Sequence, residues 1–202
     1  MNNLASAKVG ILFGTDTGNT EAMAEKINDN LTALGCDCMT SNIIDLTVDW
    51  FEPFDLIIMG IPTWDFGGIQ EDWENWEELL PLLPLHGKVV ALYGMGDQLG
   101  YGDYFVDAMG WLYEKLQATG AQFIGRWSTA GYDFEASLAV NKDKSYFCGL
   151  AIDDDQQFDL TDERIANWIT QLQQEYATID RDAENNAISE TDNNNPVMEA
   201  AL

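Results

Sequence analysis

Short apolar runs alternate with amphipathic helical patterns along this chain, and that alternation restricts the possible folds more than any other feature. Strands that are apolar on both sides belong to parallel sheets covered by helices on both faces. The expected strands cover residues 9–13, 36–42, 55–61, 88–93, 122–127 and 147–152. The expected helices cover residues 20–34, 70–80, 103–119 and 161–176, the last opened by Thr161-Asp162-Glu163-Arg164.

The domain organisation follows from this pattern and from the length of 202 residues, which suits one α/β domain. Right-handed crossovers between parallel strands leave a short list of doubly wound sheets. The polar, turn-rich segment 128–146 lies between two half-strands, so we interpret it as an insertion that splits the fifth strand. We place the domain at 1–179. Residues 180–202 are rich in Asn, Asp, Glu and Ala without an apolar period, and we expect an acidic, disordered tail there.

The charge balance excludes several classes of partner. Acids outnumber bases 35 to 9, for a formal charge of −26. Nucleic acids and anionic membranes are bound through Lys and Arg, so neither is an expected partner, whereas a basic protein surface is. No apolar run is long enough to span a bilayer, and residues 1–8 do not resemble a signal peptide. The three cysteines predict free thiols and a reducing, cytoplasmic location.

A candidate anion site follows the first strand, where residues 14–20 read Gly-Thr-Asp-Thr-Gly-Asn-Thr and a helix begins at once. A helix N-terminus offers free N–H groups and the positive end of the helix dipole. The loop has no Lys or Arg and does not match the P-loop pattern, so it suits a phosphate monoester rather than a triphosphate with Mg²⁺. The alternative interpretation is that Thr17 and Thr20 only cap the helix.

Two further loops, residues 61–73 and 93–103, follow the third and fourth strands. Ligands of doubly wound sheets bind at these carboxyl ends. Each loop places one aromatic residue, Trp64 or Tyr101, among glycines that allow close backbone approach. Two rings from separate loops can hold a flat heterocycle between them. The alternative is that both are ordinary, partly buried aromatic residues.

These loops resemble those of the long-chain flavodoxins, small FMN-containing electron carriers of bacteria and algae. The resemblance extends over about residues 8–176. Within it, residues 61–67 are most similar to one of the flavodoxin types of enteric bacteria. Residues 11–27 resemble the family's phosphate loop, and residues 94–101 resemble its second flavin loop. Residues 149–153 and 160–165 resemble its closing strand and helix, and 128–146 corresponds to the insertion of the long-chain class. It implies a five-stranded parallel sheet of order 2-1-3-4-5, for which flavodoxin is a standard example.

The resemblance also implies FMN as the cofactor and assigns its contacts. The phosphate is expected at Thr15, Asp16, Thr17, Gly18, Asn19, Thr20 and Thr63. The resemblance makes Trp64 the inner stacking ring and Tyr101 the outer one. It places the Asp65–Phe66 peptide at the flavin N5, where the family's peptide reorients when N5 gains a proton. The other expected contacts are Gly67, Met95, Gly96, Asp97, Gln98, Asp103 and, near the ribityl chain, Asp153.

Two positions depart from the family pattern. Gly68 stands where the family often has Glu or Gln, which predicts a looser loop, and Asp65 adds a charge beside N5. No catalytic residue is predicted. No metal is predicted either, because the spacing of Cys36, Cys38, Cys148 and His86 does not fit a zinc site.

The implied function is a monomeric, low-potential carrier of single electrons that works with basic redox proteins such as a flavodoxin/ferredoxin NADP reductase. Residues 45–80 contain many acids and no base, and such a surface attracts a basic partner. The alternative is an FMN-dependent NAD(P)H:quinone oxidoreductase on the same fold. Such an enzyme needs open space above the flavin, which rings at Trp64 and Tyr101 would cover, so the carrier is favoured.

Overall fold

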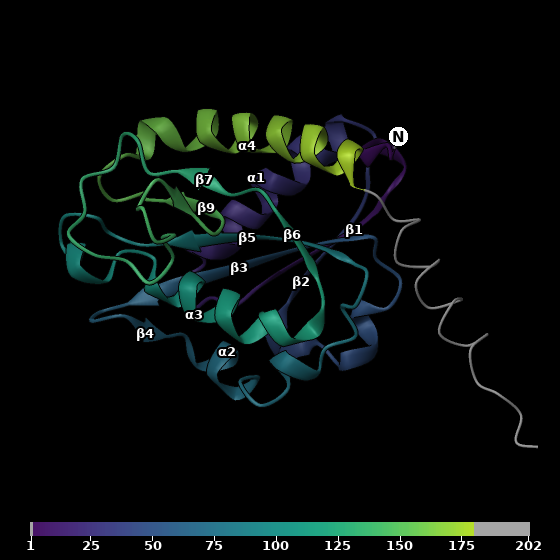
Figure 1. The fold of residues 1–202 in the computed structure, drawn as a ribbon, viewed down its shortest axis with the longest axis horizontal. Helices are drawn as coiled ribbons and strands as arrows, with labels where there is room; N and C mark the ends of the chain where they lie inside the picture. Colours follow the sequence, from purple (N-terminus) through teal and green to yellow (C-terminus); the bar gives the residue numbers. More distant parts are fainter. Residues whose placement is uncertain (1, 180–202) are drawn as a thin grey trace, which may run out of the picture.

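A five-position parallel sheet forms the centre of the molecule in the computed structural model, which describes residues 2–179 (Figure 1). The first four positions run in the order β2-β1-β3-β5, and the fifth lies beside β5. The strands are β1 (Lys8–Phe13), β2 (Asp37–Asn42), β3 (Leu56–Trp64), β5 (Val89–Met95), β6 (Gln122–Ile124) and β9 (Leu150–Ile152). The expected doubly wound fold is therefore confirmed.

The fifth position of the sheet is shared by two half-strands. β6 pairs with Val89–Ala91 of β5, and β9 pairs with Tyr93–Met95 of the same strand. Between them, β7 (Trp127–Ser128) and β8 (Tyr146–Phe147) form an antiparallel pair at the base of the inserted segment. The prediction that an insertion splits the fifth strand is confirmed.

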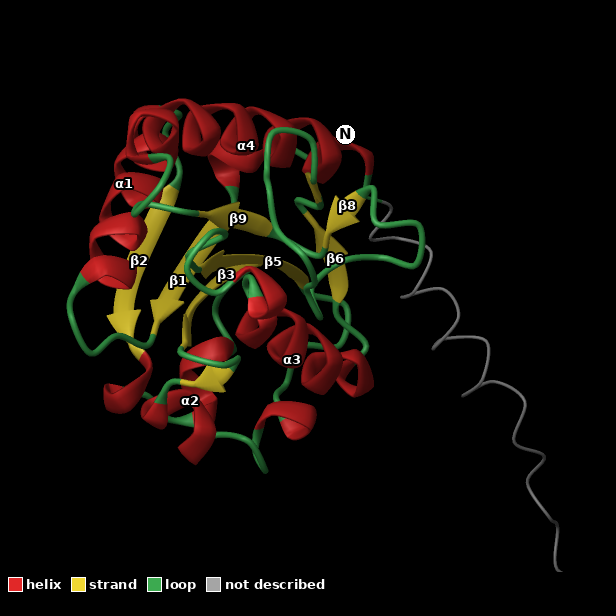
Figure 2. Ribbon diagram, turned by 90° about the vertical axis from the view of Figure 1, so that its left-hand side faces the viewer, coloured by secondary structure: helices red, strands yellow, loops and turns green. Residues whose placement is uncertain are grey.

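Helices cover both faces of the sheet (Figure 2). Two apolar clusters result because successive strand residues point to opposite faces. One cluster joins the sheet to α1 (Asn19–Ala33) and α4 (Phe158–Thr178), and the other joins it to α2 (Glu71–Asn75) and α3 (Asp107–Leu116). This sandwich leaves the carboxyl ends of the strands open to loops.

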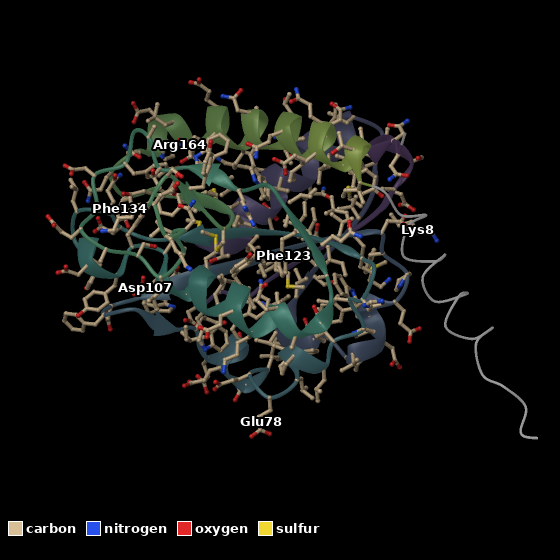
Figure 3. All side chains as sticks on the ribbon, viewed as in Figure 1. Lys8, Glu78, Asp107, Phe123, Phe134 and Arg164 are labelled. Atoms are coloured by element: carbon tan, nitrogen blue, oxygen red, sulfur yellow. The ribbon has the colours of Figure 1, made fainter. Side chains whose placement is uncertain are left out.

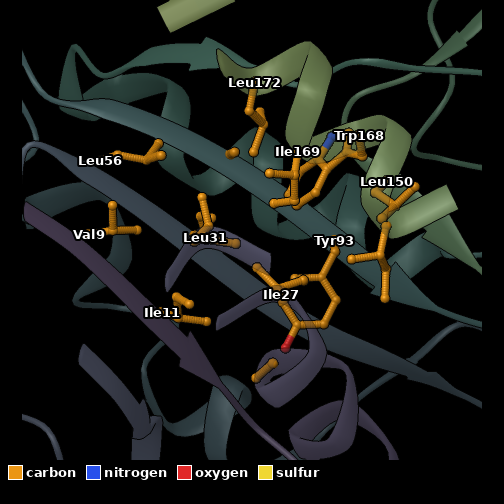
Figure 4. Close-up of a cluster of buried hydrophobic side chains, with 14 of the residues drawn as sticks. Val9, Ile11, Ile27, Leu31, Leu56, Tyr93, Leu150, Trp168, Ile169 and Leu172 are labelled. Carbon is orange, nitrogen blue, oxygen red and sulfur yellow. The ribbon is translucent and has the colours of Figure 1, made fainter. Parts of the chain in front are cut away.

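Figure 4 shows the first cluster, where Tyr93 of β5 lies beside Ile27 of α1. The buried Tyr93 hydroxyl donates a 2.9 Å hydrogen bond to the carbonyl oxygen of Thr20, in the first turn of α1. A Cβ atom at Gly60 of the neighbouring strand would lie 1.9 Å from the Tyr93 ring, so only glycine fits there. This packing fixes the start of α1 against the sheet.

The helix expected at 103–119 is wrong in its first part. The structure has a 3-10 turn at Gly102–Tyr104, and α3 begins only at Asp107. Val106 between them has φ +51°, a left-handed conformation that interrupts the helix and that β-branched residues seldom adopt. A second 3-10 turn, Gln117–Thr119, follows α3.

Two other expected helices also differ from the structure, and one strand was not expected. Only the first part of the helix expected at 70–80 is helical, as α2. Turns and a 3-10 helix, Leu80–Leu82, follow it. Thr161 does not open the last helix, because α4 begins at Phe158 and the Thr161 hydroxyl bonds Asp154 instead. A short strand, β4 (Gly68–Ile69), was not expected; it pairs with the end of β3. None of the helices within 2–179 is long and apolar enough to cross a membrane.

Candidate cofactor site

A cavity of about 270 Å³ lies beside the carboxyl ends of β1, β3 and β5. β1 and β3 are adjacent, and their following helices cover opposite faces of the sheet, which makes this the topological switch point where doubly wound proteins bind ligands. The cavity is lined by Thr15, Asp16, Thr17, Asn19, Thr20, Pro62, Thr63, Trp64, Asp65, Met95, Gly96, Asp97, Tyr101, Tyr104, Phe105, Asp154 and Asp155.

The structure brings most of the expected contacts together in this lining. The expected residues outside it are Gly18, Phe66, Gly67, Gln98, Asp103 and Asp153. A neighbouring hollow of about 280 Å³ is lined by Phe66, Gln98 and Asp103 among others. Five lining residues were not expected from the sequence: Pro62, Tyr104, Phe105, Asp154 and Asp155.

The phosphate end of the cavity is the start of α1. Gly18 takes φ +86° there, and no side chain caps the helix within the described residues. The Thr15 hydroxyl instead accepts a 3.0 Å hydrogen bond from the Gly18 N–H and shapes the loop. Since neither Thr17 nor Thr20 caps the helix, its first N–H groups remain available to an anion.

The side chain of Gln70, which the sequence interpretation missed, supports this loop. Its amide donates hydrogen bonds to Asp16 (3.1 Å) and Asp72 (2.8 Å), and it is almost fully buried. The Asp16 carboxylate is therefore bonded from the α2 side. The only sequence signal was a Gln directly before a helix, where its oxygen caps the N–H of Trp73.

The two aromatic rings reach the cavity from separate loops. Trp64 ends β3 and Tyr101 follows β5, and both side chains are only partly covered, at 37% and 40% exposure. The Tyr101 hydroxyl approaches the Asp65 carboxylate at 3.4 Å. Gly68 pairs with Trp64 across a short antiparallel ladder that closes the loop between β3 and β4.

The turn at 65–67 contains an unusual backbone. Asp65 has φ +42° and Gly67 has φ +85°, both in the left-handed region. Asp tolerates that region better than most side chains, and Gly tolerates it freely. Phe66 between them is 77% exposed, so the turn projects an aromatic side chain beside the mouth of the cavity.

The second loop is closed by the carboxylate of Asp97. Its Oδ1 accepts hydrogen bonds from the N–H groups of Leu99 (3.0 Å) and Gly100 (2.8 Å) and from the Gln156 amide (3.0 Å). Burial raises the pKa of Asp97, but these hydrogen bonds outweigh it and leave the pKa below its usual value. The carboxylate thus keeps its charge and holds the loop in one shape.

Asp153 lies beneath this loop rather than in the cavity lining. It is fully buried, and its Oδ2 accepts hydrogen bonds from the backbone N–H (3.0 Å) and side-chain amide (2.7 Å) of Gln98. Its Oδ1 accepts one from the N–H of Gln156. The Gln98 oxygen accepts a 2.6 Å bond from Asp133 of the insertion. The loop is thereby tied to the segment after β9 and to the insertion.

Two further contacts brace the ring end from α3. The Thr63 hydroxyl accepts a 3.2 Å hydrogen bond from the N–H of Ala108, in the first turn of α3. The buried Asp107 carboxylate accepts a 2.6 Å bond from the N–H of Leu138 in the insertion. Burial raises the pKa of Asp107, although that bond lowers it in part. Figure 3 shows Asp107 at the same end of the molecule as Phe134 of the insertion.

The lining is acidic on the side of the segment after β9. Asp154 and Asp155 line the cavity opposite Asp97. The pKa of Asp155 is raised by burial and by the charges of Asp97, Asp153 and Asp154. The run of three acids directly after the closing strand was a readable signal, and only its first member was selected as a site residue.

The sheet order, with its switch-point cavity at the carboxyl ends of the strands, defines an α/β protein with the flavodoxin fold. The sequence matches the family described as Flavodoxin over residues 11–168. The chain therefore belongs to the flavodoxin family.

Several relatives are closely similar in sequence and structure. Flavodoxin 2 of Salmonella typhi is 49% identical over 170 residues, 84% of this chain and 96% of the relative. Flavodoxin of Trichodesmium erythraeum is 47% identical over 172 residues, 84% and 98% of the two chains. The crystal structure of Fusobacterium nucleatum flavodoxin bound to flavin mononucleotide superposes with a TM-score of 0.77 at 31% identity, covering 84% of this chain and 98% of that one. The expected likeness to an enteric flavodoxin type is confirmed.

Proposed function

We propose that this chain binds FMN without a covalent bond in the switch-point cavity and carries single electrons between other redox proteins. The observation that carries the proposal is the pairing of two different ends in one cavity. Trp64 and Tyr101 offer aromatic faces at one end, and the uncapped start of α1 offers N–H groups at the other. A flat heterocycle joined to a phosphate matches both ends.

The residues at the phosphate end fit a monoester. Thr15, Thr17, Asn19 and Thr20 line it, and no Lys or Arg among residues 2–179 lines the cavity. Neutral donors and a helix N-terminus can hold a phosphate with two negative charges without a metal ion. Bound FMN would supply a ring system that accepts electrons one at a time.

The ring end favours a carrier over an enzyme. Rings from two separate loops line the cavity, and the exposed Phe66 lines the neighbouring hollow. A nicotinamide or quinone substrate needs an open flavin face for stacking. With Trp64 and Tyr101 on the two faces, only the edge of the flavin would meet a partner, which suffices for electron transfer.

The charge of the lining supports a low reduction potential. Asp65, Asp97, Asp154 and Asp155 line the cavity and oppose any added negative charge. One carboxylate about 10 Å away in water costs about 0.4 kcal/mol. That corresponds to about 20 mV for one electron. The same charge suits a basic partner such as a flavodoxin/ferredoxin NADP reductase.

The carrier proposal is tested by NAD(P)H oxidation. The FMN-loaded protein alone should oxidise no NAD(P)H, and adding a basic reductase should permit electron flow that falls with rising salt because the attraction is screened. NAD(P)H oxidation without added reductase would instead support the quinone oxidoreductase. As a control for the phosphate end, riboflavin, which lacks the phosphate, should bind the protein at least about 10-fold more weakly than FMN.

A further inference from the structure

A separate hollow, of about 460 Å³, lies between α3, the insertion and β8. We call it the α3 groove. It shares no lining residue with the cofactor cavity. Most of its walls are apolar or aromatic, with side chains of Trp111, Tyr113, Leu138, Val140, Tyr146 and Phe147. A protein surface of this kind marks a place where another chain segment can bind.

Leu138 shows that the α3 groove is built to present apolar surface. Its backbone is fixed on one side by the hydrogen bond to Asp107 and on the other by close packing against Gly110, where a Cβ would lie 2.4 Å from the Leu138 carbonyl carbon. The side chain nevertheless stays 71% exposed. Tyr146 on the facing strand is also exposed. A fixed backbone that holds apolar side chains in water costs free energy unless something covers them.

The border of the α3 groove also differs in charge from the rest of the chain. Arg126 lines it, and Lys142 and Lys144 are exposed in the turn beside it. None of the three makes an ion pair within the described residues. The opposing acids are Glu114 in the lining and Asp143 in the turn. Bases therefore exceed acids here, although acids outnumber bases 35 to 9 in the whole chain.

We propose that the C-terminal segment 180–202 of this same chain docks in the α3 groove. Its composition is complementary to the groove. The segment contains six acids and one base, Arg181. It ends in an apolar stretch that reads Val-Met-Glu-Ala-Ala-Leu at 197–202. The apolar end would cover the groove, and the acids would lie near the three unpaired bases.

The segment begins close enough to the α3 groove to reach it. The Gln171 amide of α4 donates a 2.7 Å hydrogen bond to the Arg126 carbonyl, and the Gly125 N–H bonds Glu175. From Gln171 to Ile179 the helix advances about 12 Å. An ideal chain of 23 residues, the number from 180 to 202, would have a root-mean-square span of about 26 Å. Tethering at such distances gives effective concentrations near the millimolar range, so a weak site is filled.

The family does not account for this segment. Flavodoxin 2 of Salmonella typhi matches 84% of this chain with 96% of its own length. Too little of the relative remains to include a counterpart of 23 residues. The docking is thus a property of this chain, and it is independent of FMN binding because the two cavities share no residue.

The test is solution NMR of the full-length, FMN-loaded, ¹⁵N-labelled protein. In the unmodified protein the amides of 197–202 should be ordered, with order parameters above about 0.6. The triple variant Val197→Asp/Met198→Asp/Leu202→Asp should release them and shift the amide signals of Leu138 and Tyr146. FMN affinity should stay unchanged, which separates this result from a failure of the proposed function.

A groove variant provides the reciprocal test. Leu138→Asp, at an exposed position, should release the C-terminal amides in the same way. The matched control is Ile44→Asp, which is similarly exposed at 65% but follows β2, at the opposite edge of the sheet. It should leave the C-terminal amides ordered.

Three results would overturn the proposal. One is that the C-terminal amides are disordered in the unmodified protein. Another is that they are ordered, but the amide signal of Leu138 does not shift in the triple variant. The signals of the α3 groove could instead shift with protein concentration, which would show that a second copy of the chain occupies it.

Discussion

The two ends of the cofactor cavity are built by different means. The phosphate end is formed mainly by one short segment, residues 15–20. The hydrogen bond that shapes its loop joins Gly18 to Thr15, three positions apart, and one distant contact, from Gln70 to Asp16, supports it. The ring end depends more on distant contacts. Gln98 bonds Asp153 across 55 positions. The Asp133 N–H bonds Gln98 across 35.

This difference separates ligand affinity from folding stability. A local loop can lose one ligand contact while the rest of the fold is unaffected. A buried, long-range carboxylate leaves several unsatisfied donors when it is removed, and that cost appears in the free energy of unfolding. Substitutions at the phosphate end should therefore change only FMN affinity, whereas those in the network of the ring end should change stability as well.

The largest effect is expected from Asp153→Ala. It removes the acceptor of three hydrogen bonds, two from Gln98 and one from Gln156, in a fully buried position. The free energy of unfolding of the apoprotein in urea should fall by about 3 kcal/mol. Asp154→Ala, which removes a partly buried bond to Thr161, should cost less than about 1.5 kcal/mol. Equal losses of unfolding free energy in the two variants would contradict the claim that the buried network of the ring end supports folding stability.

Trp64→Ala should weaken FMN binding by about 30-fold, because it removes one stacking ring and its apolar area. Since the Trp64 side chain is partly exposed without ligand, the urea midpoint should hardly change. Titration of the apoprotein with FMN, followed by flavin fluorescence, measures the affinity. Trp64→Phe should keep most of it. An unfolding midpoint that falls together with the affinity would show that Trp64 has a structural role.

Thr17→Ala should weaken FMN binding by about 10-fold through the loss of one hydroxyl donor to a charged phosphate. The stability of the apoprotein should remain the same, because Thr17 caps no helix within the described residues. Riboflavin is the matched ligand control, and its affinity should be unaffected. A parallel loss of riboflavin affinity would place Thr17 away from the phosphate.

The smallest effect is expected from the charge of Asp155. Its raised pKa means that the folded protein holds this proton more tightly than the unfolded chain, whose value is near 3.8. The contribution of Asp155 to stability therefore increases as the pH falls through the raised pKa toward that value. Asp155→Asn should flatten the dependence of the unfolding free energy on pH above about pH 3.8 at low salt.

Asp97→Asn is the control for this pH dependence. The pKa of Asp97 is lowered, so its contribution is complete above about 3.8 and is lost only below it. This substitution should lower the slope only in part, because burial, the largest cause of the raised pKa of Asp155, remains when the charge of Asp97 is removed. If both variants kept the slope, its source would lie outside the cavity.

The same distinction explains how much could be predicted. The alternation of apolar strands and helices predicted the sheet, and a Gly-Thr-rich turn before a helix indicated a cavity at the start of α1, because both patterns are local. That a phosphate binds there stays a prediction. The break in the helix at Val106 was missed because it places a β-branched residue at φ +51°, against its intrinsic preference. Such a conformation is imposed by tertiary packing.

Supporting contacts were also missed. The bond from Gln70 to Asp16 spans 54 positions, and no spacing rule connects them. Asp153 was selected as a contact near the ribityl chain, and the structure places it beneath the loop, as an acceptor for Gln98. Whether it also contacts FMN remains a prediction. Residue type indicated a functional carboxylate here, and only the fold shows which groups it holds.

The most direct test of the central claim is an anaerobic reductive titration of the FMN-loaded protein, followed by visible absorbance. A carrier of single electrons should lose its yellow oxidised spectrum in two stages, with a long-wavelength blue absorbance that rises with the first electron and disappears with the second. Direct bleaching in one stage, without the blue form, would contradict the account and indicate two-electron chemistry, and Asp65 would be the first residue to substitute.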